Sequence, residues 1–313
     1  MAKTICGVDV SSTRLDARIG HADGPYQCFE RSGEGIGALT AFCHDHGVDL
    51  VVMEATGGYE QLPFGLLWAA GISAAIVNPR AVRRFAEAMG LLEKTDRIDA
   101  GVIAWYAEVK RITPRAPASQ TQRQLAAWVG RLRQLVDLRV SQGNQRRLLR
   151  EPDVLASIDE IIATINRQIR AFETRIAALI AGDPLWTKLD ASFRSIKGVA
   201  GRTVARLMAE LPEIGTLSAK AAAKLVGLAP IAHDSGQRNG RRSVRGGRAG
   251  LRSILFVVAE VVRRHDPAFA AFRDRLAAAG KPKKVIRVAL AHKLLTQLNA
   301  KARDARNELA LAA

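Results

Sequence analysis

The sequence of 313 residues has only three cysteines and no run of uncharged apolar residues about 18 long, the length that a membrane-spanning helix needs. Cys6, Cys28 and Cys43 lack the paired spacing of zinc ligands, which predicts buried thiols in a reducing compartment. The N-terminal residues also lack the basic and apolar regions of a signal peptide. We therefore expect a soluble, cytoplasmic protein.

Acidic side chains are scarce in the last part of the chain. Residues 185–313 carry 25 basic and 9 acidic side chains, a net charge of +16, whereas residues 1–118 carry 12 and 14, a net of −2. Residues 119–184 carry 10 basic and 7 acidic side chains, a net of +3. A concentrated positive field attracts phosphate polyanions. The distribution predicts that the C-terminal part binds nucleic acid, against the alternative of a merely solvated basic surface.

Residues 1–118 alternate between strand and helix patterns. Thr4–Ser11, Leu50–Glu54 and Ile72–Val77 are apolar runs typical of buried strands, and residues 14–31 alternate like two antiparallel strands. Helical patterns separate and follow the later strands. This order predicts an α/β domain over 1–118, with a mixed sheet covered by helices.

The rest of the chain is expected to be α-helical. Apolar stripes over 119–184 predict two long helices that turn near Glu151-Pro152, either an antiparallel hairpin or an oligomerising coiled coil. Within a mostly helical domain over 185–313, Phe193–Leu211 resembles a helix-hairpin-helix. Ile231–Gly250 is rich in Gly, Arg and Ser and predicts a long functional loop. The sequence thus predicts an α/β domain, a helical connector and a helical C-terminal domain.

Four acids stand out by their positions in the first domain. Asp9 lies in the first predicted strand, Glu54 ends another, and Asp96 and Asp99 share one face of a predicted helix. A carboxylate in an apolar strand is costly unless it is paired or ligates a metal, and oxygen-only ligands suit Mg²⁺ or Mn²⁺. Such a set could hold two ions about 4 Å apart for phosphoryl transfer. For each acid the alternative is a helix cap or a surface charge.

These residues belong to longer motifs, which are Gly7–Ser11 (GVDVS), Met53–Glu60 (MEATGGYE), Asn78-Pro79 and Lys94–Ala100 (KTDRIDA). With these motifs the chain resembles the insertion-sequence transposases with a DEDD RuvC-like domain, a family that includes the Piv invertases and acts as bridge-RNA-guided recombinases. The resemblance covers essentially the whole chain and implies a RuvC-like, RNase H-like first domain.

A second signature lies in the basic part of the chain. Leu225–Pro230 (LVGLAP), Ser235-Gly236 and Gly250–Leu255 (GLRSIL) resemble the C-terminal transposase domain of the same family, whose nucleophilic serine lies in the Ser-Gly step. The resemblance implies that Ser235 is the nucleophile. A serine among arginines could meet a phosphate in a stabilising positive field, and Ser243 in the same loop is the second candidate.

Basic side chains around these motifs are the predicted nucleic-acid ligands. In the helix-hairpin-helix, backbone N–H groups of the turn could hold a phosphate without reading sequence, although a plain helical turn is the alternative. The residues predicted to contact nucleic acid are Lys197, Arg202, Arg238, Arg241, Arg242, Arg245, Arg248 and Arg252.

Three functional hypotheses follow. The first is a DNA recombinase in which Ser235 attacks the scissile phosphate while Asp9, Glu54, Asp96 and Asp99 hold Mg²⁺. The resemblance also implies donor and target DNA, a structured noncoding RNA, and a dimer or tetramer with a site shared between subunits, acting at the nucleoid of a prokaryotic cell. The second is a metal-dependent junction-resolving nuclease, in which water attacks. The third is a nucleic-acid-binding protein without activity, which the presence of all four acids disfavours.

Overall fold

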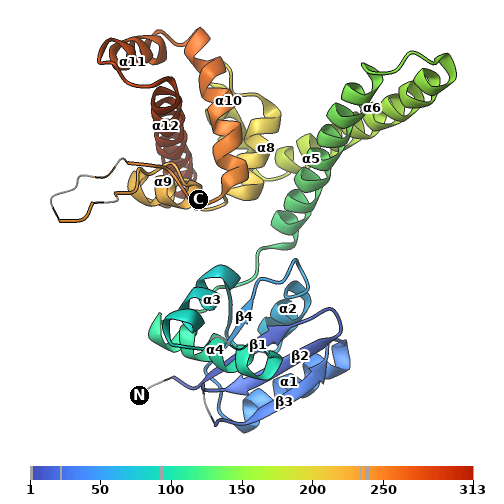
Figure 1. Cartoon of the computed structure of the whole chain (residues 1–313), viewed down its shortest axis with the longest axis vertical. Coiled ribbons are helices and arrows are strands. Elements are labelled where there is room, and N and C mark those ends of the chain that lie inside the picture. The colour runs from blue at the N-terminus through green and yellow to red at the C-terminus, as the bar shows by residue number, and fades with distance from the viewer. Residues whose placement is uncertain are drawn as a thin grey trace. The chain divides into compact units, whose positions relative to one another are not determined.

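The structure is a computed structural model, and it describes nearly the whole chain. The described residues are 3–21, 23–91, 93, 95–232, 234–236, 240 and 242–312, without the side chains of Asp96, Arg97 and Ala312. The chain forms two compact units, Met1–Ala118 and Ser119–Ala313, whose helices and strands are labelled in Figure 1. The helices of residues 119–184 belong to the second unit, and the division into three domains stays a prediction.

A mixed five-stranded sheet forms the centre of the first unit. Its strands lie in the order β3-β2-β1-β4-β5. The first three strands form an antiparallel meander, whereas β4 pairs in parallel with both β1 and β5. The helices that precede β4 and β5 provide the crossovers that parallel strands need. The strands are β1 (Ile5–Val10), β2 (Arg14–Ile19), β3 (Tyr26–Glu30), β4 (Leu50–Glu54) and β5 (Ala74–Val77).

Helices cover both faces of this sheet. Apolar residues of α1 and α2 share a core with one face of β1 and β4, and those of α3 and α4 share a core with the other face. Helix α4 approaches β1 so closely that a Cβ on Gly7 would lie 2.0 Å from the carbonyl oxygen of Ala100. The helices are α1 (Gly33–Asp45), α2 (Gln61–Ala69), α3 (Pro79–Ala88) and α4 (Asp96–Val109).

The second unit is entirely helical apart from its loops. Helices α5 and α6 form the long hairpin seen in Figure 1, and α8, α9, α10, α11 and α12 pack with its base and with α7 into one hydrophobic core. The bounds are α5 (Gln120–Arg146), α6 (Pro152–Ala181), α7 (Pro184–Arg194), α8 (Gly201–Glu210), α9 (Ala219–Val226), α10 (Ala249–His265), α11 (Pro267–Ala278) and α12 (Lys283–Ala312).

The predicted fold class, an α/β sheet domain followed by helices, is confirmed by these elements. Two features differ from the sequence analysis. The helix α11 has no counterpart there, although Asp266 caps it by accepting hydrogen bonds from Ala268 N and Phe269 N, a signal that the sequence contains. Cys28 is exposed rather than buried, because it lies on the edge strand β3. Among the described residues, no helix is both long and apolar enough to cross a membrane.

One buried acid in the sheet has a phenolic partner. Asp16 on β2 is only 3% exposed, and the hydroxyl of Tyr26 on β3 donates a hydrogen bond to its Oδ1 atom. This bond, with burial and the negative charge of Asp16, raises the pKa of Tyr26 to about 12. The guanidinium of Arg18 lies 5.6 Å from the centre of the Tyr26 ring. Tyr26 therefore stays protonated and fixes the Asp16 carboxylate.

We predict that ionisation of Tyr26 gives a late phase in the alkaline titration of the folded protein, because its pKa is raised to about 12. Since its folded pKa is raised, its contribution to stability is complete below about pH 10 and is lost as the pH rises toward 12. An absorbance titration at alkaline pH should show this late phase in the wild type and lose it in Tyr26→Phe. The exposed-tyrosine variant Tyr59→Phe should keep it, and its absence from the wild type would contradict the assignment.

Candidate functional site

Two of the predicted metal ligands lie at the carboxyl ends of neighbouring strands. In the parallel pair of β1 and β4, Val8 lies opposite Met53, so Asp9 and Glu54 are the next residues on each strand. Val8 and Met53 point into the core shared with α1 and α2. Because side chains alternate along a strand, both carboxylates lie on the opposite face, toward α4. Both residues are half-buried.

Helix α4 runs antiparallel to β1, which directs its first turn toward Asp9. Gly7 in the middle of β1 lies against Ala100 near the start of α4. Further along the helix, Trp105 lies with its ring 4.9 Å from that of His21, beside the N-terminal end of β1. The start of α4 therefore lies toward the end of β1 that carries the acid.

The other two predicted ligands lie in this first turn of α4. Thr95 caps the helix, with its Oγ1 atom 3.3 Å from Ile98 N, and Asp99 is half-buried. The side chain of Asp96 lies outside the described part of the structure. Among the described side chains, no group of three or more His, Cys, Asp or Glu lies close enough to hold a metal ion. The four-carboxylate site therefore stays a prediction, supported by placement and by the oxygen-only chemistry of its donors.

The segment after Glu54 is held by a second glutamate. Glu60, only 5% exposed, accepts hydrogen bonds of 2.9 Å from Thr56 N, Gly58 N and Gln61 Nε2. Burial alone would raise the pKa of Glu60. The hydrogen bonds from Gln61 and the backbone lower it by more than burial raises it, so the pKa lies below its usual value. The glycines supply the positive φ angles, 65° at Gly57 and 111° at Gly58. The MEATGGYE motif is therefore, in part, a fixed turn beside Glu54.

Asp16 is a candidate that the sequence analysis missed. It lies directly opposite Asp9 in the antiparallel pair of β1 and β2, on the α4 side of the sheet. Two like charges opposite each other on a sheet repel, and the hydroxyl of Tyr26 offsets part of that repulsion by donating to Asp16. The sequence shows an acid between Leu15 and Ala17 in a strand pattern. The strand register that places this acid opposite Asp9 cannot be read from the sequence.

The loop between α9 and α10 carries Ser235, and its base is a close crossing of two backbone segments. A Cβ on Gly247 would lie 2.4 Å from Gly227 N, and both glycines have positive φ angles, 64° and 81°. Arg252 Nη1 donates to the carbonyls of Gly246 at 2.6 Å and Gly227 at 3.4 Å. Only glycine at the crossing permits this approach. The described parts of the loop extend beyond α9 in Figure 1.

Above this base, the described residues of the loop are joined by a strand bridge and by contacts of Asp234. Ile231 N donates to Ser243 O at 2.8 Å, which pairs the two arms of the loop. Asp234 accepts a hydrogen bond of 3.0 Å from Gly240 N and forms an ion pair of 3.0 Å with Arg242 Nη2. Ser235 is exposed beside Gly236, whose φ angle is 53°. Arg238 and Arg241 lie outside the described residues.

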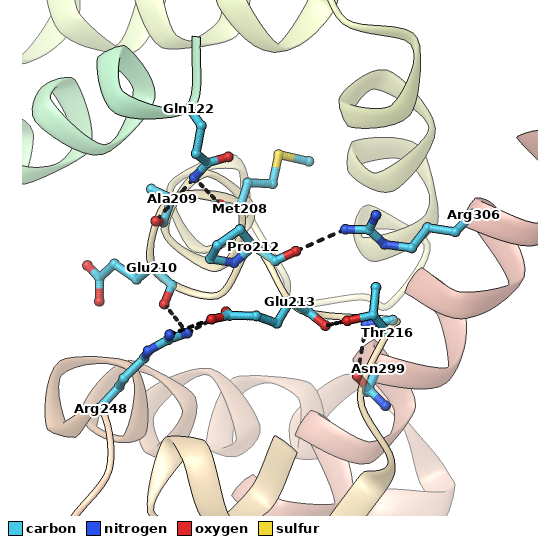
Figure 2. Close-up of polar contacts among 11 residues, drawn as sticks. Gln122, Met208, Ala209, Glu210, Pro212, Glu213, Thr216, Arg248, Asn299 and Arg306 are labelled. Atoms are coloured by element: carbon cyan, nitrogen blue, oxygen red, sulfur yellow. Dashed lines mark hydrogen bonds and ion pairs between the residues drawn. The ribbon is translucent and has the colours of Figure 1, made fainter. Parts of the chain in front are cut away.

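A cluster of polar contacts, the polar hub, joins the loop to the turn between α8 and α9. Figure 2 shows Arg248 with both terminal nitrogens on Glu213, at 2.7 and 2.8 Å, while Nη1 also donates to the carbonyl of Glu210 at 2.8 Å. Helix α12 holds the same turn, since Arg306 donates to Pro212 O at 3.0 Å and Asn299 Oδ1 accepts from Gly215 N at 2.9 Å.

The α5 end of the hairpin also contacts the polar hub. Gln122 Nε2 donates to the carbonyls of Met208 at 3.0 Å and Ala209 at 3.4 Å in the last turn of α8. Side-chain donors therefore satisfy carbonyls that a helix end leaves without a partner in the helix. These anchoring residues are not among those predicted from the sequence. The sequence signal was Asn299, a polar residue next to Leu298 in α12, and the structure shows it to be only 1% exposed.

The other predicted nucleic-acid ligands differ in their surroundings. Lys197 is exposed in the turn between α7 and α8, and Arg245 is exposed in the loop. Arg202 instead forms an ion pair with Glu173 of α6. Gly198 packs the α7–α8 turn onto α10, where its Cβ would lie 3.0 Å from Val262 N. Contact of these residues with nucleic acid stays a prediction.

Two segments of the chain match known sequence families. Residues 6–151 match the family DEDD_Tnp_IS110, described as a transposase. Residues 190–274 match the Transposase IS116/IS110/IS902 family. The first match contains all four predicted acids, and the second contains Ser235 and the arginines of its loop.

Several known proteins are similar to this chain. The pilin gene-inverting proteins of Moraxella bovis and Moraxella lacunata are each 29% identical to it over 316 residues, with 95% of this chain and 94% of the relative covered. An uncharacterised 43.6 kDa protein of insertion element IS110 from Streptomyces coelicolor is 33% identical over 154 residues, which cover 48% of this chain and 37% of that protein. Among solved structures, Thermus thermophilus RuvC matches with a TM-score of 0.27 and 17% identity, covering 36% of this chain and 99% of RuvC.

The order of the two matches agrees with the two signatures in the sequence. The acidic motifs fall in the first match, and the loop with its glycine crossing falls in the second. The relatives extend over nearly the full length. The chain belongs to the IS110 family of transposases, enzymes of DNA recombination.

Proposed function

We propose that this transposase cuts and rejoins the DNA of an insertion sequence with Ser235 as its nucleophile. The observation that carries the proposal is the placement of Ser235. It is exposed in a loop whose base is fixed by the glycine crossing and the polar hub. A fixed base with an accessible tip suits a residue that must reach a phosphate in a bound duplex.

The chemistry is a pair of phosphoryl transfers. Ser235 Oγ attacks the scissile phosphorus, the bond from phosphorus to the sugar oxygen of the leaving strand breaks, and the serine proton ends on that oxygen. A hydroxyl of the incoming strand then attacks the phosphoserine, and the proton returns to Ser235. Charge develops on the phosphate oxygens in both steps, and guanidinium groups such as that of the exposed Arg245 would stabilise it.

The acids of the first unit would hold Mg²⁺, with Mn²⁺ as the alternative. Asp9 and Glu54 end adjacent strands on one face, and the α4 turn with Asp96 and Asp99 lies toward it. A bound divalent ion supplies Lewis-acid stabilisation of phosphate oxygens. The chain's own part is to direct carboxylates to one end of the sheet and to fix the turn after Glu54 through Glu60.

The proposed partners are nucleic acids and further copies of the chain. The net charge of +16 over residues 185–313 favours binding of donor and target DNA. The name of the Moraxella relatives, pilin gene-inverting protein, describes a rearrangement of DNA. A structured noncoding RNA that selects the sites by base pairing, and a dimer or tetramer whose site combines the acids of one subunit with the serine of another, complete the proposal.

We predict a covalent protein–DNA adduct that depends on Ser235. The wild type, Ser235→Ala and Ser243→Ala are incubated with the natural DNA junction and any RNA it requires, and denaturing gels separate the products. Attack by serine leaves a phosphoserine link, whereas attack by water cannot. The adduct should disappear in Ser235→Ala and persist in Ser243→Ala. Cleaved DNA without any adduct would favour the junction-resolving nuclease, and loss in Ser243→Ala alone would make Ser243 the nucleophile.

We predict that each acid is required for strand exchange and for metal binding. Asp9→Asn, Glu54→Gln, Asp96→Asn and Asp99→Asn each remove one ligand charge, and each should reduce strand exchange at least about 100-fold. The melting temperature of the wild type should rise with added Mg²⁺ or Mn²⁺, and that shift should shrink in each variant. The exposed Glu87→Gln on α3 is the matched control. A variant with full activity and an unchanged metal shift would remove its residue from the site.

We predict that Arg248 anchors the loop rather than binding nucleic acid. Arg248→Gln leaves the carboxylate of Glu213 and the carbonyl of Glu210 without the guanidinium, which should cost about 2 kcal/mol of unfolding free energy. Chemical denaturation measures this cost, and combining the variant with Glu213→Gln should recover part of it. Arg245→Gln, in the same loop but exposed, should leave stability unchanged. Unchanged stability with weakened DNA binding in Arg248→Gln would contradict the anchoring role.

A further inference from the structure

A pocket of about 440 Å³ lies between the base of the Ser235 loop and helices α11 and α12. Its walls are mainly apolar. The loop contributes Leu228, Pro230 and Val244, α11 contributes Phe272, and α12 contributes Val285 and Val288. A volume of this size is within the range of small-ligand sites and exceeds what one planar base requires.

The polar groups of the pocket are cationic or can form hydrogen bonds. Arg242 and Lys284 line it and are exposed, so they lie where the pocket meets solvent. Lys293 is held in place, since its Nζ donates to Ala268 O at 2.8 Å and lies 5.0 Å from the centre of the Phe272 ring. Ser243 contributes a hydroxyl to the lining. Among the described residues that line the pocket there is no carboxylate, although Arg242 is paired with Asp234 beside it.

We propose that this pocket receives one unpaired nucleotide of the bound nucleic acid. The base would enter between the apolar walls and Phe272, and its phosphate would stay at the mouth near Lys284 and Arg242. An apolar side chain of a protein partner would fit the walls but would gain nothing from the cations, whereas a nucleotide uses both. A base still paired in a duplex cannot enter, so the occupant is a single-stranded or extruded nucleotide.

The pocket lies next to the proposed nucleophile, and the role inferred for it rests on the proposed function. Arg242 and Ser243 line the pocket and also belong to the arm that pairs with Ile231 and holds Asp234, next to Ser235. A nucleotide seated there would fix the strand at a set distance from the nucleophile. The pocket would therefore position the strand during exchange and would not take part in bond breaking.

The test uses the full-length protein and a single-stranded DNA oligonucleotide that carries 5-iodouracil. Irradiation should crosslink the base to lining residues within 228–230, 242–244, 284–293 or at Phe272, as located by mass spectrometry. Fluorescence anisotropy measures affinity for the same oligonucleotide without the halogen. Ala289→Phe fills the pocket and should weaken binding about ten-fold, in line with the loss of one base contact. Ala310→Phe, an equal change at an exposed site of α12, should not.

A second variant guards against misfolding of the first. Lys284→Gln removes an exposed cation, should keep the melting temperature, and should reduce both the affinity and its salt dependence. Crosslinks only outside the pocket, crosslinks to a second copy of the chain, or wild-type affinity in a folded Ala289→Phe would overturn the proposal. Ser235→Ala should crosslink like the wild type. An adduct at Ser235 without pocket crosslinks would therefore overturn the pocket proposal and support Ser235 as the nucleophile. Pocket crosslinks without an adduct would support the pocket and contradict the role of Ser235.

Discussion

The guanidinium of Arg248 is the contact on which the geometry of the second unit depends. It joins the end of the Ser235 loop to the turn between α8 and α9 through two bonds to Glu213 and one to a helix-end carbonyl. Helix α12 holds the same turn through Asn299 and Arg306, and α5 holds the last helical turn of α8 through Gln122. The position of the loop thereby depends on two further helices from distant parts of the sequence.

The Ser235 loop has different contacts at its base and at its described tip. At the base, the crossing of Gly227 and Gly247 brings backbone against backbone, and Arg252 bridges the carbonyls on either side. Beyond it, the described tip has one strand bridge and the contacts of Asp234. The contacts at the base therefore place the loop independently of those at its described tip.

One strand of the first unit carries both a close packing contact and a predicted metal ligand. Gly7 lets α4 approach β1, and Asp9 lies two residues further along the same face. The close approach therefore brings the start of α4 toward the acid. Asp16 adds a second carboxylate from the neighbouring strand, held by Tyr26. The cost of gathering like charges is tolerable only where a cation or fixed donors offset their repulsion.

Local sequence patterns explain why much of the secondary structure could be predicted from the sequence. Strand alternation, helical stripes and caps such as Thr95 depend on neighbouring residues, so the sheet, most helices and the placement of Asp9, Glu54 and Asp99 could be predicted. The motif resemblance named the family for the same reason, since its glycines and acids are contiguous strings. The partners of the arginines could not be predicted this way. Arg248 and Arg202 are predicted phosphate ligands, and only the structure shows that each also has a carboxylate partner far away in the sequence.

The sequence by itself determined the fold class and the family, because these follow from local periodicity and from short motifs, whereas the role of the four acids stays a prediction. Only the tertiary structure decided that Asp16 lies opposite Asp9, that Glu213 and Asn299 anchor the loop, and that a pocket opens beside it. These facts depend on strand register and on contacts between residues more than 30 positions apart in the loop anchor. Such pairings are fixed by the packing of whole helices and strands, which no local pattern encodes.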